Sequence, residues 1–346
     1  MHFEEVDRVP FSPGGPYIET LNRWYGEGLP WGMSVNDYFN YDKFEGVPID
    51  FGPIPRFITR TLEEDEHYRI VTGWRGFGIK VKELKTSESM PYFLEFPVKS
   101  HEDFEKMKAR YDPADERRYP LTWSEELFEY YSTTDRPVQI GGFPFTGVFS
   151  QARWMVGLER LLVSFYRDPE FVRDMFNFFT DFQCEVLRSV LPKVKTDGAI
   201  FFEDMAYKTG PMIGPNLFRE FMLPCYKKLT ETLRNNGVDI IFVDTDGNAN
   251  VLIPLFLEAG VNGISPLEVA AGVDAVPLRE KYGKKLLLMG NVDKRALALG
   301  KKAIKREIER VLPLMKDGGF IPSIDHAVAH DVSFENFTYY VSLLKP

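Results

Sequence analysis

The stretch 239–248, DIIFVDTDGN, is an apolar run that ends in two carboxylates and a glycine. Such a run is typical of a parallel strand that helices cover on both faces, because nearly every position is then buried. Similar runs alternate with helical patterns through the second part of the chain, which predicts a parallel α/β sheet. The other expected strands are VQIGGFPF (138–145), GAIFFEDMAY (198–207), VNGISPLE (261–268), KLLLMGNVD (285–293) and GFIPSIDHAV (319–328).

Two architectures satisfy this alternation, a doubly wound sheet and a closed barrel. The chain has no GxGxxG motif to favour the first, and no GxxxxGK[ST] phosphate loop. Polar residues instead follow many different strands, and a barrel gathers the carboxyl ends of all its strands at one face. We therefore predict a (β/α)8 TIM barrel. The polar residues are Glu203 and Asp204, Asp244 and Asp246, Glu268, Asn291 and Asp293, and Asp325 and His326. The expected helices cover 150–163, 169–190, 215–236, 251–259, 276–282 and 301–317.

Residues 1–135 are irregular and rich in Pro, Gly and aromatic residues, and we expect them to form cap elements. Residues 136–346 carry the regular β/α repeats, and the whole chain 1–346 is predicted to be one barrel domain. Within the first part, a helix is expected at 18–25 and a hairpin at 68–82. Ser100, followed three residues later by Asp103, predicts the start of a short helix.

Composition excludes several classes of protein. The 346 residues include 42 Lys and Arg against 51 Asp and Glu, a net charge of -9, which argues against binding nucleic acid or an anionic membrane. No apolar run approaches the ~18–20 residues of a transmembrane helix, and the start MHFEEVDRVP does not resemble a signal peptide. Cys184 and Cys225 lie far apart, which excludes a disulfide scaffold and suits a cytoplasmic protein.

Asp244 and Asp246 are the first candidate pair for chemistry. In a strand, residues at i and i+2 point the same way, so both carboxylates would share one site and need a cation or a shared proton. Alternatively the chain has already entered a turn there and both side chains face water. His326, just after the last strand, would face the barrel mouth, whereas His330 would face solvent. Carboxylates and one histidine suit a divalent ion, zinc among them.

Two further segments carry candidate residues. FFEDMAYKTGP (201–211) places Glu203, Asp204 and Lys208 around Tyr207, either as a working site or as a salt-bridged loop. GGFPFTG (141–147) has glycines that allow close backbone approach, and its Phe143 and Phe145 would wall a pocket or belong to the core.

The chain resembles the uroporphyrinogen decarboxylase superfamily over most of its length. The resemblance rests on EFPVKSHEDFEKM (95–107), EDMAYKTGPMIGPNLFREFMLP (203–224), VDTDGN (243–248), ISPLEVAAGVD (264–274), LLLMGNVDKRALALG (286–300) and GGFIPSIDHAVAHDVSFENF (318–337). It implies a (β/α)8 barrel with its active site at the carboxyl ends of the strands. Decarboxylases of this superfamily carry an N-terminal segment of the type RQAGRY that holds the substrate's carboxylates. The present FSPGGPYIETLNRWYGEGLP (11–30) has only Arg23, which weakens that assignment.

The other branch of the superfamily consists of corrinoid-dependent methyltransferases, some with zinc in a His-x-Cys…Cys arrangement. Here Asp244-Thr-Asp246 and His326 stand at the matching positions, with Glu268 near a further acidic position. The resemblance therefore implies a divalent metal, with zinc expected, held among Asp244, Asp246, Glu268 and His326. An oxygen-rich site suits an ether more than a thiol, which indicates the branch that demethylates methyl ethers.

The expected activity is methyl transfer from a methyl ether, with a methoxylated aromatic suspected, to Co(I) of a separate corrinoid protein that carries the cobalamin. Glu203, Asp204 and His326 are the catalytic candidates. A decarboxylase and a non-catalytic ligand-binding barrel remain the alternatives. The oligomeric state stays open, a homodimer included. The substrate-binding candidates are Phe143, Phe145, Trp154, Met205, Tyr207, Lys208 and Asn291.

Overall fold

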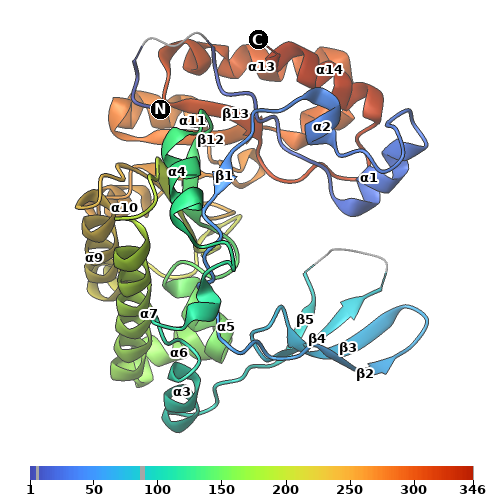
Figure 1. Cartoon of the computed structure of the whole chain (residues 1–346). Helices are drawn as coiled ribbons and strands as arrows, with labels where there is room; N and C mark the ends of the chain where they lie inside the picture. Colours follow the sequence, from blue (N-terminus) through green and yellow to red (C-terminus); the bar gives the residue numbers. More distant parts are fainter. Residues whose placement is uncertain (5–7, 86–89, 346) are drawn as a thin grey trace.

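A computed structural model of the protein describes residues 1–4, 8–85 and 90–345. Its centre is a curled parallel sheet with strand order β1-β6-β7-β10-β11-β12-β13, and helices lie along its outer side (Figure 1). Every neighbouring pair of strands is parallel, so the predicted α/β class is confirmed. These strands are β1 (Glu45–Gly46), β6 (Val138–Gly141), β7 (Gly198–Phe202), β10 (Ile240–Asp244), β11 (Gly263–Ser265), β12 (Leu287–Val292) and β13 (Phe320–Ile324).

The sheet does not close by regular strand pairing within the described residues, since β1 and β13 form its two edges. Residues 13–17 lie beside β13 instead, where Ile324 N–H donates to the Pro13 carbonyl (3.0 Å) and Val328 N–H donates to that of Gly15 (3.0 Å). Farther along, Asp42 N–H donates to the Phe11 carbonyl (2.9 Å). Irregular segments thus occupy the gap where an eighth strand was expected, and the closed barrel stays a prediction.

The helices match the sequence patterns best where a clear start and stop exist. The expected ranges 18–25, 169–190 and 301–317 are observed as α1, α7 and α13, and Pro169 stands at the first position of α7. The helices are α1 (Ile18–Tyr25), α2 (Val35–Phe39), α3 (His101–Lys108), α4 (Glu125–Thr133), α5 (Phe149–Val156), α6 (Leu158–Arg167), α7 (Pro169–Val190), α8 (Pro215–Leu217), α9 (Leu223–Arg234), α10 (Ile253–Glu258), α11 (Ala275–Tyr282), α12 (Lys294–Ala298), α13 (Lys301–Asp317) and α14 (Phe334–Leu344).

Two expected helices are interrupted. The range 150–163 is divided between α5 and α6 at Gly157, whose φ of +83° L residues rarely adopt. The range 215–236 contains a π-helical segment, Phe218–Met222, between α8 and α9. A run of helix formers does not reveal such breaks, because the packing of neighbouring segments determines them.

The N-terminal part contains a second sheet, which stands apart from the parallel sheet in Figure 1. It is antiparallel, with order β2-β3-β4-β5, and the expected hairpin at 68–82 is its central pair. The expected start of α3 is also confirmed, since Ser100 Oγ accepts the Asp103 N–H at 3.1 Å. The strands are β2 (Arg60–Glu64), β3 (Tyr68–Trp74), β4 (Ile79–Leu84) and β5 (Tyr92–Glu95), and a short ribbon follows β7 as β8 (Ala206–Tyr207) and β9 (Gly210–Pro211).

The buried apolar side chains form two clusters. One surrounds β6, β7 and helices α5 to α9. The other joins the N-terminal residues Phe11, Trp24 and Tyr41 to the last strands and to Phe337 and Tyr340 of α14. Within the described part of the chain, no helix has both the length and the apolar character needed to cross a bilayer.

Gly157 gives a direct test of the break between α5 and α6. A Cβ at this position would meet the ring of Phe96 at 2.5 Å, whereas a Cβ at Gly237, with a similar φ of +84°, would meet no heavy atom within 4 Å. We expect Gly157→Ala to lower the free energy of unfolding by about 2–4 kcal/mol, since left-handed backbone and overpacking both contribute. Gly237→Ala, the matched control, should cost only about 1–2 kcal/mol. Equal losses in urea unfolding would contradict this account.

Candidate active site

The carboxyl ends of β10 and β13 bring together Asp244, Asp246 and His326. Asp244 is the last residue of β10, and His326 follows β13 by two residues. His326 Nε2 lies 3.3 Å from Asp246 Oδ2, and its Nδ1 lies 2.8 Å from the hydroxyl of Tyr17. Two of the predicted site residues are therefore in contact, and a third neighbours them. Sequence reasoning missed Tyr17, and its only signal would have been the need for the N-terminal segment to lie beside the last strand.

Asp244 is a half-buried carboxyl group at this end of the sheet. Burial, reinforced by the negative charges of Asp246 and Asp204, raises its pKa to about 7, and the charge of His326 opposes this rise. Around neutral pH both the protonated and the ionised form of Asp244 are thus populated. It is a candidate acid, a role for which the sequence pattern alone pointed to other residues.

His326 has the opposite tendency. Its pKa is raised first by the hydrogen bond to Asp246 and further by the charges of Asp246 and Glu268, while burial and Lys294 oppose this. The Asp246–His326 pair is therefore favoured in its charged form, and Tyr17 fixes the orientation of the ring from the other side.

Two further acidic residues have basic partners. Glu268 accepts a hydrogen bond from the Lys294 ammonium at 3.2 Å and from the Gly247 N–H at 3.1 Å. Asp204 Oδ2 is 2.8 Å from the nearly buried guanidinium of Arg153. Lys294 and Arg153 thus neutralise much of the negative charge at this end of the sheet.

Glu203 is fully buried and serves the fold. Its carboxylate accepts the N–H groups of Val148 (2.7 Å) and Ser150 (2.9 Å), at the start of α5, and the hydroxyl of Tyr226. Burial raises its pKa to about 7 against the opposing effect of these hydrogen bonds. A group with this environment caps a helix, and its catalytic role stays a prediction that these contacts do not support.

Asn291 and Asp325 also hold backbone segments in place. The buried Asn291 amide donates to the carbonyls of Leu267 and Val273, and its φ of +63° turns the side chain toward that loop. Asp325, buried as well, accepts the N–H groups of Val269 and Lys294. Both residues connect the loops after β11 and β12. The Asn291 Oδ1 accepts from the Ala275 N–H and from Arg310, both at 2.9 Å, so Asn291 has no side-chain atom left for the expected substrate contact.

The aromatic candidates divide between the loops and the core. Phe143 is 52% exposed and packs edge-on against Phe202, with the Arg75 guanidinium 4.6 Å from its ring centroid. Arg75 lies between β3 and β4, so the antiparallel sheet borders the loop after β6. The other candidates lie as follows: Phe145 packs on Phe77, Trp154 and Met205 are buried, and Tyr207 and Lys208 are exposed on the β8–β9 ribbon.

The predicted metal ligands do not assemble into a ligand set in this structure. Among the described residues, no group of three or more His, Cys, Asp or Glu side chains is arranged to hold a metal ion. Asp246 contacts only one of the other candidates, His326, and Glu268 is bound by the ammonium of Lys294. The residues present therefore fit proton chemistry better than metal coordination.

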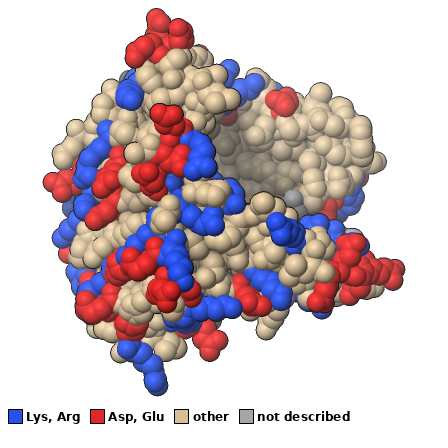
Figure 2. All heavy atoms as spheres, turned by 60° about the horizontal axis from the view of Figure 1, so that its bottom comes forward, with Lys and Arg blue, Asp and Glu red and all other residues tan. Residues whose placement is uncertain are grey.

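Figure 2 shows a deep hollow beside the lobe that carries the antiparallel sheet. Residues other than Lys, Arg, Asp and Glu form most of its visible wall. Such a wall suits an uncharged or aromatic ligand.

Comparisons with known proteins agree with this architecture. The family model described as uroporphyrinogen decarboxylase (URO-D) matches residues 68–345. The uroporphyrinogen decarboxylase of Rickettsia bellii is 21% identical over 98% of this chain and 96% of its own. That of Danio rerio is 26% identical over 72% of this chain and 68% of its own. Among solved structures, a methyltransferase from Methanosarcina mazei has a TM-score of 0.64 at 17% identity, over 98% of this chain and 94% of its own, which shows a shared fold.

The capping role of Glu203 predicts a pH dependence of stability. Its folded pKa of about 7 lies above the ordinary value of 4.5. While the group is protonated in both the folded and unfolded states, its ionisation therefore takes nothing from the free energy of unfolding. The cost appears as pH rises from about 4.5 to 7 and reaches about 3 kcal/mol. In urea unfolding, Glu203→Gln should therefore gain stability relative to the parent protein over this range. The exposed Glu159→Gln serves as control and should show no such trend; a flat difference for Glu203→Gln would contradict the assignment.

Proposed function

The chain belongs to the uroporphyrinogen decarboxylase family, and we propose that it is a methyltransferase that moves a methyl group from a methyl ether to the Co(I) of a separate corrinoid protein. The observation that carries this proposal is Asp244, a carboxyl group with a pKa of about 7 near the Asp246–His326 pair. A methyl ether is a poor methyl donor unless its oxygen receives a proton as the carbon–oxygen bond breaks, and this site offers that proton. In this proposal the curled sheet acts as a (β/α)8 barrel, with residues 13–17 beside β13 in the place of an eighth strand.

Decarboxylation of a tetrapyrrole is the alternative, and the names of the curated relatives favour it. The pairing of Arg153 and Lys294 disfavours it, because these two cations at the carboxyl ends are bound to Asp204 and Glu268 and do not offer their charges to a substrate that carries many carboxylates. Arg23, the one arginine of the N-terminal segment 11–30, forms an ion pair with Glu27 at 2.7 Å and donates to the Val332 carbonyl. Its guanidinium is therefore already bound within the protein and does not serve a substrate carboxylate.

The proposed reaction requires one acid and one group that stabilises the developing negative charge. The methyl carbon bonds to cobalt as its bond to the ether oxygen breaks, the electron pair stays on that oxygen, and the oxygen takes the proton of Asp244. His326, oriented by Tyr17 and Asp246, supports the developing negative charge on the oxygen. The products are the alcohol or phenol and the methylated corrinoid. No metal ion takes part in this scheme.

The substrate would be a methoxylated aromatic compound. Phe143 offers an exposed ring next to Phe202, and Arg75 lies over its face. An aromatic ring stacks well on such a surface. A corrinoid protein needs an open approach, and in this proposal it docks at the hollow of Figure 2.

The first prediction concerns the transfer itself. Incubation with a methoxylated aromatic compound and a reduced corrinoid protein encoded nearby should give methylcobalt and the free phenol in equal amounts, measured by absorbance and chromatography. His326→Ala should lower kcat/KM by roughly 10²–10⁴-fold, because Asp246 loses its partner and the developing charge on the substrate oxygen loses the support of the imidazole.

Phe143→Ala is the matched variant for substrate binding. It should raise KM through lost apolar contact of roughly 1–3 kcal/mol and leave kcat nearly unchanged. Release of carbon dioxide from a tetrapyrrole without a corrinoid protein would overturn the assignment, and so would normal transfer by His326→Ala.

The second prediction concerns pH. If Asp244 supplies the proton, kcat/KM should be constant below about pH 6 and should fall as pH rises through about 7, since the acid form is lost there. Asp244→Asn should remove this pH dependence along with most of the activity. Tyr17→Phe should keep the Asp244 step in the profile, because it alters only the support of His326. A profile in which activity rises through pH 7 would contradict the role of Asp244.

A further inference from the structure

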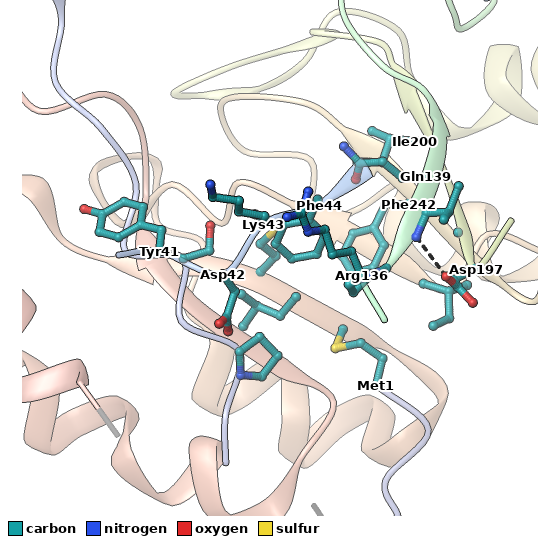
Figure 3. Close-up of a pocket in the computed structure, with 18 of the residues that line it drawn as sticks. Met1, Tyr41, Asp42, Lys43, Phe44, Arg136, Gln139, Asp197, Ile200 and Phe242 are labelled. Carbon is teal, nitrogen blue, oxygen red and sulfur yellow. Dashed lines mark hydrogen bonds between the residues drawn. The ribbon is translucent and has the colours of Figure 1, made fainter. Parts of the chain in front are cut away.

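A large cavity lies inside the curled parallel sheet and begins at the amino ends of its strands. Its volume is about 1160 Å³. The first residues of three strands, Val138, Gly198 and Ile240, border it, and Figure 3 shows part of its lining, including Phe44 and Arg136. The volume exceeds the ~300–1,000 Å³ of pockets for drug-sized ligands, so the cavity can hold more than a single ring.

The register of the strands places the inner end of this cavity beside Asp244. Alternate residues of a strand point to the same face, so Ile240, Phe242 and Asp244 of β10 share one face, and the first two line the cavity. Ser265 of β11 also lines the cavity and is the register partner of Asp244. The cavity therefore reaches the row of side chains that contains the proposed acid.

The direction of methyl transfer determines where the rest of the methyl donor lies. In the reaction proposed above, cobalt attacks the methyl carbon in line with its bond to the ether oxygen. The remainder of the ether must therefore lie on the side of that carbon away from cobalt. Because the corrinoid protein approaches from outside at the carboxyl ends, an ether whose oxygen is at Asp244 directs its remainder into the sheet, toward the cavity.

The lining of the cavity differs between its amino end and its deeper part. At the amino end it carries charges of both signs, with Lys43 and Lys195 and also Asp135 and Asp197. Such a mixture gives no preference for an anionic or a cationic ligand. The wall farther along the strands is apolar and consists of Ile200, Phe242, Met289 and Ile321.

We propose that this cavity binds the apolar body of the methyl donor. The proposal rests on the methyl transfer proposed above and narrows its substrate class to methoxylated aromatics with a long uncharged substituent opposite the methoxy group. The methoxy group lies at Asp244, and the ring lies near Phe202, the register partner of Asp244 on β7. The substituent runs past Phe242 toward Ile240.

The length of the substituent provides the first test. Binding of anisoles that carry a methyl, butyl or hexyl group at position 4 is measured by isothermal titration calorimetry with the intact protein and no corrinoid protein. Each added methylene group should tighten binding about fourfold, because it moves from water to an apolar wall. In the transfer assay with the corrinoid protein, kcat/KM should rise in the same order.

Two substitutions shorten the cavity at different depths. Ile240 precedes Asp244 by four residues of β10, about 13 Å at ~3.3 Å per residue, and Ile200 is opposite Phe242, which precedes Asp244 by two. Ile240→Trp should weaken binding of 4-hexylanisole about tenfold and leave that of 4-methylanisole within about twofold, because only the long chain loses the contact of about two methylene groups. Ile200→Trp should weaken 4-butylanisole by a similar factor.

Val163→Trp is the matched control. Val163 is 47% exposed on α6 and does not line the cavity. This variant should leave the binding of all three anisoles within about twofold, as expected for a surface substitution. Thermal melting verifies that each variant folds, and if one of the two cavity variants does not fold, the other still decides.

An affinity that does not rise from the methyl to the hexyl compound would overturn the proposal, and so would an equal rise in the parent protein and in both cavity variants. The expected binding pattern without any methylcobalt would refute the methyl transfer and still support the cavity as the site for the apolar body. Methyl transfer with a kcat/KM that does not depend on the substituent would overturn the cavity proposal alone.

Discussion

The hydrogen bonds of one imidazole ring join three distant parts of the chain. His326 contacts Tyr17 of the N-terminal segment through Nδ1 and Asp246, beyond β10, through Nε2. The ring can do so only because residues 13–17 lie along β13, where backbone hydrogen bonds to Ile324 and Val328 hold them. His326 therefore has its observed hydrogen bonds only when the N-terminal segment lies along β13.

Electrostatics at the carboxyl ends follows from how the acidic residues are paired. Asp204 has Arg153, Glu268 has Lys294, and Asp246 has His326. Asp244 has no such ion pair within the described part of the chain, and it lies half-buried near the charges of Asp204 and Asp246. Its charge is therefore balanced by a proton, which the pKa of about 7 expresses. Ionisation of such a carboxyl group lowers the free energy of unfolding, and its protonated form can donate a proton near neutral pH.

Sequence reasoning predicted the elements with strong local signals. Pro169 and the periodic pattern after it locate α7, and the apolar runs locate the strands. It did not predict the break at Gly157, because a single glycine among helix formers gives no sign of the Phe96 ring packed against it.

At the site, the sequence placed Asp244, Asp246 and His326 at the carboxyl ends correctly, since parallel strands gather their ends. The roles of Glu203 and Asn291 could not be read from it. Glu203 follows β7 and Asn291 lies near the end of β12, where active residues occur, but Tyr226 and the start of α5 surround the first, and the second has a φ of +63° and binds the loop after β11. These are properties of packing between distant segments.

The second apolar cluster has a consequence for synthesis of the protein on the ribosome. Trp24 Nε1 donates to the carbonyl of Val332, 308 residues later in the chain, and its ring packs on Phe337. At ~5–20 residues per second, roughly 15–60 s separate the emergence of these partners. Through that interval Trp24 lacks the C-terminal rings that cover it in the folded protein. The nascent chain is therefore exposed to aggregation at its N-terminal end, and it is this end for which an early-binding chaperone would matter most.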